Sequence, residues 1–218
     1  MAGSKRTRRT RKLFLFDQPF LDQHGCIAGL DEAGCGPLAG PVVAAAVVLP
    51  TSCKLPRLDD SKKLSPEDRD ILFPLISAVA LAVGVGIIEA DEIDRINIRQ
   101  AGFAAMRQAL ESLTVFPKHL LIDGFRLPGV AHSQTRVVGG DARSSHIAAA
   151  SIIAKVTRDR LMITWHEKFP VYGFKRHKGY GTREHLVALQ KFGPSPIHRL
   201  TYAPVQAAKR LIPAFINE

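Results

Sequence analysis

The first indication of chemistry in this sequence is the placement of four acidic residues. Each follows a short apolar segment that we predict to be a buried strand: Asp31 and Glu32 follow residues 26–30, Asp123 follows residues 120–122, and Asp141 follows residues 136–138 after two glycines. The ends of strands in α/β sheets are rigidly held while the connecting loops vary, so functional sites are commonly assembled there. If the three strands are neighbours, the four carboxylates meet at one edge of the sheet.

Four carboxylates at one edge repel one another, so they either raise each other's pKa or bind cations. Oxygen ligands favour Mg²⁺ or Mn²⁺, and the sequence has no cluster of histidine and cysteine with the spacing of a zinc site. An acidic cluster that binds two such ions typically hydrolyses phosphodiesters. The alternative is structural, because aspartate before glycine is a common turn residue and Asp141 could cap a following helix. The strand-end pattern alone leaves both interpretations open.

The composition is that of one soluble globular domain, since the 218 residues are 46% hydrophobic and 23% charged. The three cysteines, Cys26, Cys35 and Cys53, form no C-x-x-C pair, which excludes a disulfide scaffold. An odd number of cysteines without an export signal suits a reducing cytosol. No apolar segment approaches the roughly 20 residues of a membrane-spanning helix. We therefore expect a cytoplasmic monomer that makes no contact with membranes.

The net charge of +10 is unevenly distributed along the chain. Residues 1–12 carry six basic side chains and no acidic one, and residues 155–210 carry 12 basic against three acidic side chains. This pattern indicates a polyanion held by both ends over an acidic centre, although solvated surface charge would give the same pattern. We predict that residues 1–24 form a flexible basic arm and that residues 25–218 form one domain.

The elements expected to position the acidic residues belong to an α/β fold with a helical C-terminal extension. Strands are predicted over residues 26–30, 42–49, 80–88, 120–122 and 136–138. Ser65 and Pro66 have the residue types of a helix start, and this helix runs towards residue 77. Further helices are expected over residues 91–113, 145–169, 183–191 and 205–211.

Several blocks of the sequence resemble the ribonuclease HII family. They are residues 27–45 (IAGLDEAGCGPLAGPVVAA), 60–64 (DSKKL), 122–124 (IDG), 140–141 (GD), 148–159 (AAASIIAKVTRD), 177–182 (HKGYGT) and 193–199 (GPSPIHR). The blocks occur in family order over residues 26–205, nearly the whole chain. The resemblance implies a ribonuclease H-like fold, a mixed central sheet flanked by helices, with a helical substrate-binding part over about residues 157–212.

The activity that this resemblance implies is that of a metal-dependent endoribonuclease. Such an enzyme hydrolyses the RNA strand of RNA/DNA hybrids and cuts 5′ to single ribonucleotides in duplex DNA, leaving 3′-hydroxyl and 5′-phosphate ends. The resemblance assigns Asp31, Glu32, Asp123 and Asp141 as catalytic ligands of two Mg²⁺ or Mn²⁺ ions. One ion would activate a water for in-line attack while the other stabilises the leaving 3′-oxygen.

The resemblance also implies a set of substrate contacts. The backbone of Gly34, Cys35 and Gly36 would contact the 2′-hydroxyl that separates RNA from DNA, and Tyr180 would pack on the sugar of the following deoxynucleotide. Ser61 and Lys62 match a segment that contacts phosphates. Lys155 and Arg158 could contact phosphates in the same way, or they could form a solvated helix face, as basic residues at i and i+3 usually do.

One position departs from the family pattern. The family's loop normally reads Gly-Arg-Gly, whereas this chain has Cys35 at the central position. A small thiol thus replaces a fixed cation near the scissile phosphate. We expect the backbone contacts of the loop to persist, with weaker substrate binding or a relaxed preference for the RNA–DNA junction.

Two alternative functions share many of these features. A ribonuclease HIII-like nuclease resembles this pattern, but that family carries a sizeable N-terminal substrate-binding domain, and only about 25 residues precede the first motif here. A non-catalytic nucleic-acid-binding protein would have the same basic ends and no need of the acidic residues. Replacing Asp123 with asparagine separates this second alternative from an enzyme, because only an enzyme loses cleavage.

Overall fold

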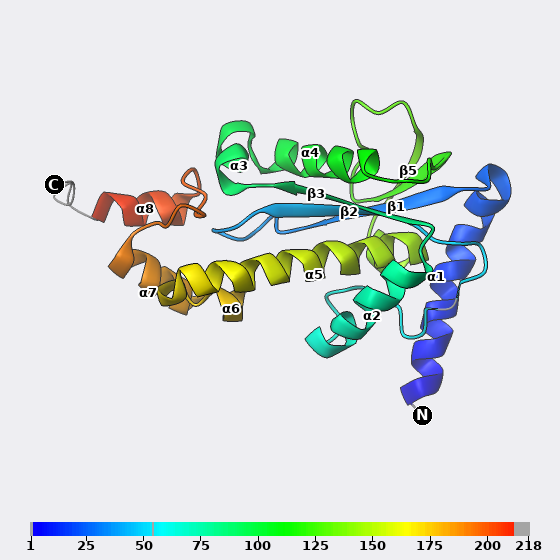
Figure 1. Ribbon diagram of the computed structural model, residues 1–218, viewed down its shortest axis with the longest axis horizontal. Coiled ribbons are helices and arrows are strands. Elements are labelled where there is room, and N and C mark those ends of the chain that lie inside the picture. Colours follow the sequence, from blue (N-terminus) through cyan, green and yellow to red (C-terminus); the bar gives the residue numbers. More distant parts are fainter. Residues whose placement is uncertain (1, 54, 212–218) are drawn as a thin grey trace.

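The computed structural model describes residues 2–53 and 55–211, which fold around one five-stranded sheet. The strands are β1 (Ile27–Ala33), β2 (Val42–Val48), β3 (Ala82–Ile88), β4 (His119–Asp123) and β5 (Ser133–Val137), in the order β3-β2-β1-β4-β5 (Figure 1). Neighbours among β3, β2 and β1 are antiparallel, whereas β1, β4 and β5 run parallel. The predicted mixed sheet is therefore confirmed.

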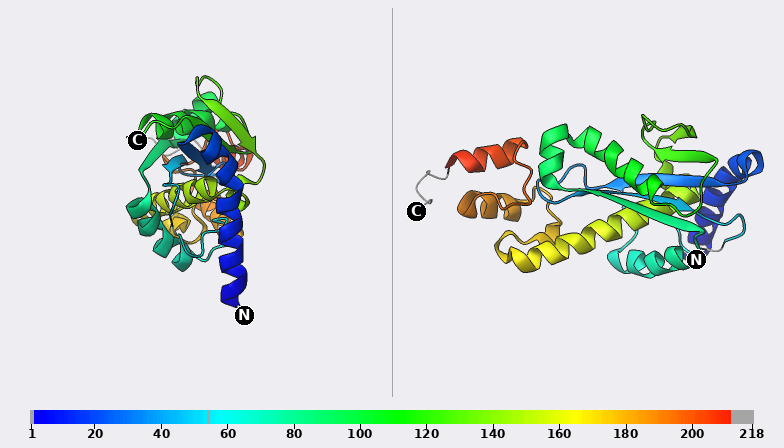
Figure 2. Two further views of the ribbon diagram at one scale, coloured as in Figure 1. Left: turned by 90° about the vertical axis from the view of Figure 1, so that its right-hand side faces the viewer. Right: turned by 45° about the horizontal axis from the view of Figure 1, so that its top comes forward.

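Helices cover both faces of the sheet. On one face lie α3 (Ala90–Ile96) and α4 (Ile98–Glu111), and on the other lie α2 (Pro66–Val79) and α5 (Ser145–Lys168) (Figure 1). The chain then continues through α6 (Phe174–His177), α7 (Arg183–Phe192) and α8 (Ala203–Leu211), which extend beyond one end of the sheet (Figure 2). In the part of the chain that the structure describes, no helix is long and apolar enough to cross a bilayer.

Strand β2 shows how the two covered faces appear in the sequence. All seven of its residues are valine or alanine, and all are buried. Ala44 and Ala46 belong to the core between the sheet and α4, while Ala45 and Val47 belong to the core formed with α5 and α2. Successive side chains of a strand point to opposite faces, so a strand covered on both sides is apolar throughout.

Helix α5 lies unusually close to β1. A Cβ atom at Gly29 would lie 2.1 Å from the carbonyl carbon of His146, so glycine is needed for the first turn of α5 to lie against the strand. The Ser144 side chain caps this helix by accepting a hydrogen bond from the N–H of Ile147. The first ten residues of α5 are all buried. This helix is therefore an internal support for the residues around it.

The N-terminal segment differs from the sequence prediction. It forms helix α1 (Ala2–His24), where a flexible arm was expected. Leu13 and Leu21 are buried against the rest of the molecule, and Phe16 and Phe20 pack on the core cluster of Leu21. The prediction of a flexible arm is wrong because it used the positive charge of the segment and missed this apolar stripe, which recurs at helical spacing.

A buried aspartate joins α1 to the start of α5. The Oδ2 atom of Asp17 accepts hydrogen bonds from Ser145 Oγ (2.5 Å), His146 Nδ1 (2.8 Å) and the backbone N–H of His146 (3.1 Å). Asp17, Ser145 and His146 are each at most 1% exposed. A carboxylate at a helix N-terminus satisfies free N–H groups and interacts favourably with the helix dipole. Asp17 therefore acts as a second cap of α5, supplied by another helix.

Two other boundaries also differ from the predictions. The single helix expected over residues 91–113 is divided into α3 and α4 at Asn97, whose φ of 66° lies in the left-handed region. The Asn97 side chain caps α4 by accepting from two backbone N–H groups. Strand β1 continues to Ala33, so Asp31 and Glu32 lie inside the strand and not after its end.

Candidate active site

The register of the sheet brings the acidic residues to one level. β1 and β4 are parallel neighbours, and Leu30 of β1 pairs with Ile122 of β4. Asp31 and Asp123 each follow directly after this pair, so they lie at the same level of the sheet. The N–H of Gly140 donates to Asp123 Oδ1 at 2.7 Å, and this bond holds the turn that carries Asp141 beside the end of β4. With Glu32 next to Asp31, four carboxylates from three segments of the chain are brought together.

The segment between β2 and α2 adds two of the predicted residues to this cluster. The ammonium of Lys62 donates to Asp141 Oδ2 at 3.0 Å. Ser61 Oγ lies 2.7 Å from Ser151 Oγ on α5, and Ser151 in turn hydrogen-bonds the carboxylate of Asp31. Both Ser61 and Lys62 therefore contact the acidic cluster, one directly and one through Ser151.

The same segment is held in place by an arginine that the sequence reasoning did not select. Arg69 Nη1 donates to the carbonyl oxygens of Ser61 and Leu64, both at 2.8 Å. Asp60 accepts a hydrogen bond from the backbone N–H of Lys62 at 2.9 Å. These bonds fix the backbone on both sides of Lys62 and so restrict where its ammonium can reach.

Burial and mutual repulsion perturb three of the carboxylates. Burial, followed by the charges of Glu32 and Asp123, raises the pKa of Asp31 well above its usual value. Burial is also the main cause of the raised pKa of Glu32 and of Asp123, and repulsion from a neighbouring acid adds to each. Burial works to lower the pKa of Lys62, but its bond to Asp141 and the charge of Asp31 raise it overall. The cluster thus holds more negative charge than the Lys62 ammonium balances.

This donor set fits a hard divalent cation such as Mg²⁺ or Mn²⁺, because it consists of carboxylate oxygens with an excess of negative charge. Among the described residues, no three histidine, cysteine or acidic side chains are already arranged to enclose an ion. Their oxygens are turned to partners in the protein: Asp31 Oδ1 to the N–H of Glu32 (2.8 Å), Asp123 Oδ1 to Gly140, and Asp141 Oδ2 to Lys62. Enclosing an ion therefore requires rotation of these side chains.

A fully buried arginine holds the loop that follows β1. Arg199 donates to the carbonyl oxygens of Gly34 (2.6 Å), Cys35 (3.1 Å) and Gly40 (2.9 and 3.1 Å). The backbone N–H groups of Cys35 and Gly36 donate to no group in the part of the chain described. The loop therefore keeps free N–H donors available to a ligand while its carbonyl oxygens are engaged by Arg199.

Arg158 holds the same loop from another side. It is fully buried and donates to the carbonyl oxygens of Pro41 (2.9 Å), Lys178 (3.0 Å) and Ala39 (3.1 Å). Burial lowers the pKa of Arg158 to about 10. The expectation that Arg158 contacts a phosphate is wrong, because its guanidinium is inaccessible. Gly34 is required beside it, since φ is 102° and a Cβ atom would lie 2.2 Å from Arg158 Nε.

The side chain of Cys35 faces the acidic cluster. Its Sγ atom donates to Glu32 Oε1 at 3.5 Å. Burial, with the negative charge of Glu32 adding to it, raises the pKa of the Cys35 thiol to about 12. The thiol is therefore neutral at physiological pH, and position 35 supplies no cation to the loop.

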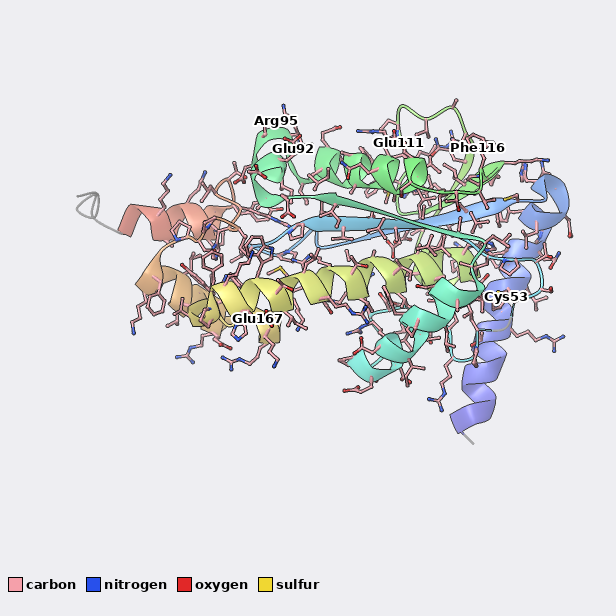
Figure 3. The ribbon with its side chains drawn as sticks, viewed as in Figure 1. Cys53, Glu92, Arg95, Glu111, Phe116 and Glu167 are labelled. Atoms are coloured by element: carbon pink, nitrogen blue, oxygen red, sulfur yellow. The ribbon has the colours of Figure 1, made fainter. Side chains whose placement is uncertain are left out.

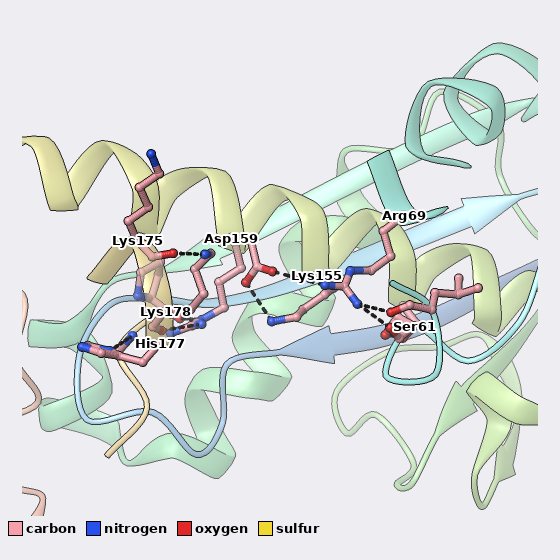
Figure 4. A network of polar contacts seen from close by, with 12 residues as sticks. Ser61, Arg69, Lys155, Asp159, Lys175, His177 and Lys178 are labelled. Atoms are coloured by element: carbon pink, nitrogen blue, oxygen red, sulfur yellow. Dashed lines mark hydrogen bonds and ion pairs between the residues drawn. The ribbon is translucent and has the colours of Figure 1, made fainter. Parts of the chain in front are cut away.

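Tyr180 lies across from this loop. Tyr180 is 44% exposed, and a Cβ atom built on Gly36 would lie 3.8 Å from Tyr180 Cε1. The ammonium of Lys155 stands 5.9 Å from the centre of the same ring and donates to Asp159 at 2.8 Å (Figure 4). Gly36, Tyr180 and Lys155 thus form one continuous surface.

A positively charged groove of about 340 Å³ continues from Tyr180 between α2, α5 and residues 176–180. Its basic lining residues are Arg69, Lys155, Arg160, Arg176 and Lys178, and its acidic ones are Asp70 and Asp159. Several of them belong to one polar network (Figure 4). An excess of cations along a groove suits a phosphate backbone. Most of these basic side chains belong to the positively charged C-terminal third of the sequence, so part of that charge lies along this groove.

The structure thus brings together all the residues predicted for the site except Arg158. Sequence reasoning missed three supporting residues: Arg69, Ser151 and Arg199. Ser151 and Arg199 lie inside blocks that resemble the family, so the sequence marked these positions but did not indicate what their side chains do. Arg69 had no signal, because its two bonds go to backbone carbonyl groups, which leave no trace in the residue types.

Comparisons with known proteins agree with this geometry. The family model described as Ribonuclease HII matches residues 28–205. A relative named Ribonuclease HII from Bacillus licheniformis is 58% identical over 181 residues, covering 83% of this chain and 71% of the relative. Another of that name from Geobacter sulfurreducens is 57% identical over 180 residues, 83% of each chain. The crystal structure of the ribonuclease H2 from Pyrococcus horikoshii OT3 matches with a TM-score of 0.74 at 27% identity, covering 85% of this chain and 97% of that one.

Proposed function

Because this chain belongs to the ribonuclease HII family, we propose that it hydrolyses the RNA strand of RNA/DNA hybrids and cuts 5′ to single ribonucleotides in duplex DNA. The products carry 3′-hydroxyl and 5′-phosphate ends. The chain is an endonuclease of the type 2 ribonuclease H class and acts on nucleic acid. Membership of the ribonuclease HII family is the reason to prefer this function over the ribonuclease HIII-like and non-catalytic alternatives. The observation that carries the proposal is the cluster of four carboxylates, which the pairing of β1 with β4 and the bonds of Gly140 and Lys62 bring to one edge of the sheet.

In this proposal Asp31, Glu32, Asp123 and Asp141 bind two Mg²⁺ or Mn²⁺ ions. When bound, the two ions supply an activated water for in-line attack and stabilisation of the leaving 3′-oxygen. Ser151 orients the carboxylate of Asp31, and the N–H of Gly140 orients that of Asp123. Lys62 keeps a positive charge at the cluster, where it can meet the scissile phosphate once Asp141 turns to an ion.

The substrate is proposed to lie across the loop after β1. The free N–H groups of Cys35 and Gly36, with Gly34 shaping the loop, are suited to the 2′-hydroxyl that marks the RNA–DNA junction. Tyr180 packs on the neighbouring deoxyribose, and the basic groove beside it follows the phosphates. Residues from about 157 to 212, including α6 to α8, make up the substrate-binding part of the domain. All of the proposed ligands come from one chain, so the site needs no second copy, and we propose that the enzyme acts as a monomer.

An end-labelled DNA duplex that contains one ribonucleotide tests this function. With Mg²⁺ or Mn²⁺ present, we expect a single cut on the 5′ side of the ribonucleotide. Asp123→Asn and excess chelator should each abolish the product, because either change removes the ligand set for the ions. Binding of the uncut duplex, followed by fluorescence anisotropy, should persist in both cases.

The matched control is Asp22→Asn, which makes the same chemical change at an exposed aspartate of α1. It should leave the cutting rate unchanged. The proposal fails if the duplex is not cut, if the cut falls elsewhere, or if Asp123→Asn cuts as fast as Asp22→Asn.

A further inference from the structure

A small pocket opens beside the acidic cluster on the face of the sheet that carries α4. It encloses about 120 Å³, and two residues of the site, Glu32 and Cys35, form one of its walls. The opposite wall is mainly apolar and comes from α4, with Ile98, Phe103 and Met106, and from Phe125. Because Glu32 follows Asp31 along a strand, the two side chains point to opposite faces. The pocket therefore adjoins the cluster on the side away from Ser151 and α5.

Phe125 is the exposed edge of this pocket. It lies two residues after Asp123, and its side chain is 49% exposed although it is a large hydrophobic residue. The guanidinium of Arg99 stands 5.0 Å from the centre of its ring, and that of Arg136 stands 6.0 Å away. Cations at these distances are attracted to the ring face. An aromatic ring with two positive charges near it is thus presented to solvent.

Neither of these guanidinium groups has a carboxylate or hydrogen-bond partner within the described residues, although both belong to exposed side chains. Several other exposed arginines of the chain are paired with a carboxylate, as Arg95 is with Glu92 and Arg176 is with Glu184. Unpaired cations beside a carboxylate cluster are suited to an anionic ligand that reaches the cluster. The combination of a flat apolar surface and free cations matches a nucleotide, which has an apolar sugar face and a phosphate.

We propose that this pocket, the Phe125 pocket, binds a nucleotide of the cleaved strand adjacent to the scissile phosphate. Phe125 packs against the sugar of that nucleotide, and Arg99 contacts its phosphate. The inference rests on the proposed function, because it takes the cleaved strand to pass the acidic cluster. It extends the contact surface to the α4 side of the cluster, opposite to Tyr180 and the basic groove.

The test compares cleavage by wild type and Phe125→Ala on duplexes that contain one ribonucleotide. In a second series, one nucleotide at a time near the cut is replaced by a three-carbon spacer, which keeps the phosphates and removes sugar and base. We expect Phe125→Ala to lower kcat/KM on the intact duplex by about tenfold, the size typical of an aromatic contact to a nucleotide. For one spacer position, wild type and variant should cleave at the same rate, because the partner of the ring is already gone.

Arg99→Gln tests the phosphate contact. Its binding to the uncut duplex should lose about one unit from the slope of log affinity against log salt concentration. This variant should keep its deficit on every spacer duplex, because the spacers retain the phosphates. The matched control for the charge is Arg107→Gln on the same helix, which should bind with the wild-type salt slope.

Phe116→Ala is the matched control for the ring, because Phe116 is a 77% exposed phenylalanine beyond the far end of α4 (Figure 3). It should leave kcat/KM unchanged. The inference is overturned if Phe125→Ala behaves like Phe116→Ala, or if its loss is the same for all spacer positions. Failure of the wild-type enzyme to cut the intact duplex would instead refute the proposed function.

Discussion

Replacing Asp17 with alanine tests whether α1 is an integral part of the folded domain. The substitution removes the acceptor of three buried hydrogen bonds, from Ser145 Oγ, His146 Nδ1 and the N–H of His146. Ser145 Oγ lies 3.5 Å from His146 Nδ1, so these two groups can satisfy each other in part. About two donors then remain unpaired, at about 1–3 kcal/mol each. We expect the free energy of unfolding to fall by about 2–6 kcal/mol.

Urea denaturation at equilibrium, followed by circular dichroism, measures this loss. With a slope of about 2 kcal/mol per molar urea, a loss of 3 kcal/mol lowers the midpoint by about 1.5 M. Asp17→Asn should fall between wild type and alanine. Its carbonyl oxygen can still accept, but its amide group would meet the position of Asp17 Oδ1, which has no partner among the described residues.

The control is Asp22→Ala, which removes an exposed carboxylate from the same helix. Its free energy of unfolding should stay within about 0.5 kcal/mol of wild type. If Asp17→Ala is no less stable than Asp22→Ala, Asp17 does not hold α1 on α5 and the reasoning is refuted. The same holds if both variants lose stability equally.

Three further outcomes are expected. Cys35→Arg should strengthen duplex binding and steepen its salt dependence by about one unit, and unchanged affinity and junction preference would contradict the role assigned to this loop. Arg199→Met should lower the free energy of unfolding by about 2 kcal/mol or more in urea melts, because the buried carbonyl groups of Gly34 and Gly40 lose their donor; a loss below 1 kcal/mol would contradict it. Burial lowers the pKa of His185 to about 4 and that of His198 to about 3, so the unfolded chain binds more protons below pH 6.5. The contribution of these two histidines to stability should therefore be complete above that pH and fall as the pH drops towards 4, by about 1.4 kcal/mol per pH unit for each histidine. His198→Gln should then lose less stability than wild type between pH 7 and pH 5 in urea melts; an equal loss in both would refute this.

Local patterns in the sequence predicted most of the regular elements. The continuous apolar run over β2 marks a strand buried on both faces, and the structure confirms it. Ser65 does cap α2, by accepting from the N–H of Asp68, as its residue type and position indicate. These features depend on neighbouring residues, so they can be read without knowledge of tertiary contacts.

The features that the sequence did not reveal depend on contacts between distant residues. Asp17 and His146 are separated by 129 positions, and the residue types alone do not indicate that they meet. The same is true of Arg199 and Gly34, which are 165 positions apart. Asn97 interrupts a helix whose apolar periodicity continues across the break, so periodicity predicted one helix where the backbone forms two.

The acidic cluster depends both on local sequence patterns and on contacts between distant residues. Asp123 was identified by its place after a short apolar strand, a local signal. The sequence does not show that the strands are neighbours; the parallel pairing of β1 with β4 does. The contact of Lys62 with Asp141 had no local signal, since Lys62 lies in a turn-rich segment 79 positions away.

The hydrogen bonds from Arg199 to the loop after β1 have a consequence for evolution. Its bonds go to main-chain oxygens, which all twenty amino acids possess, so the shape of the loop does not depend on the side chain at position 35. Substitutions at that position can therefore change substrate preference during evolution while the fold of the loop is kept. A saturation library at codon 35 should yield mostly well-expressed proteins with graded activities. The same library at Gly34, where a Cβ atom would collide with Arg158, should yield mostly insoluble ones.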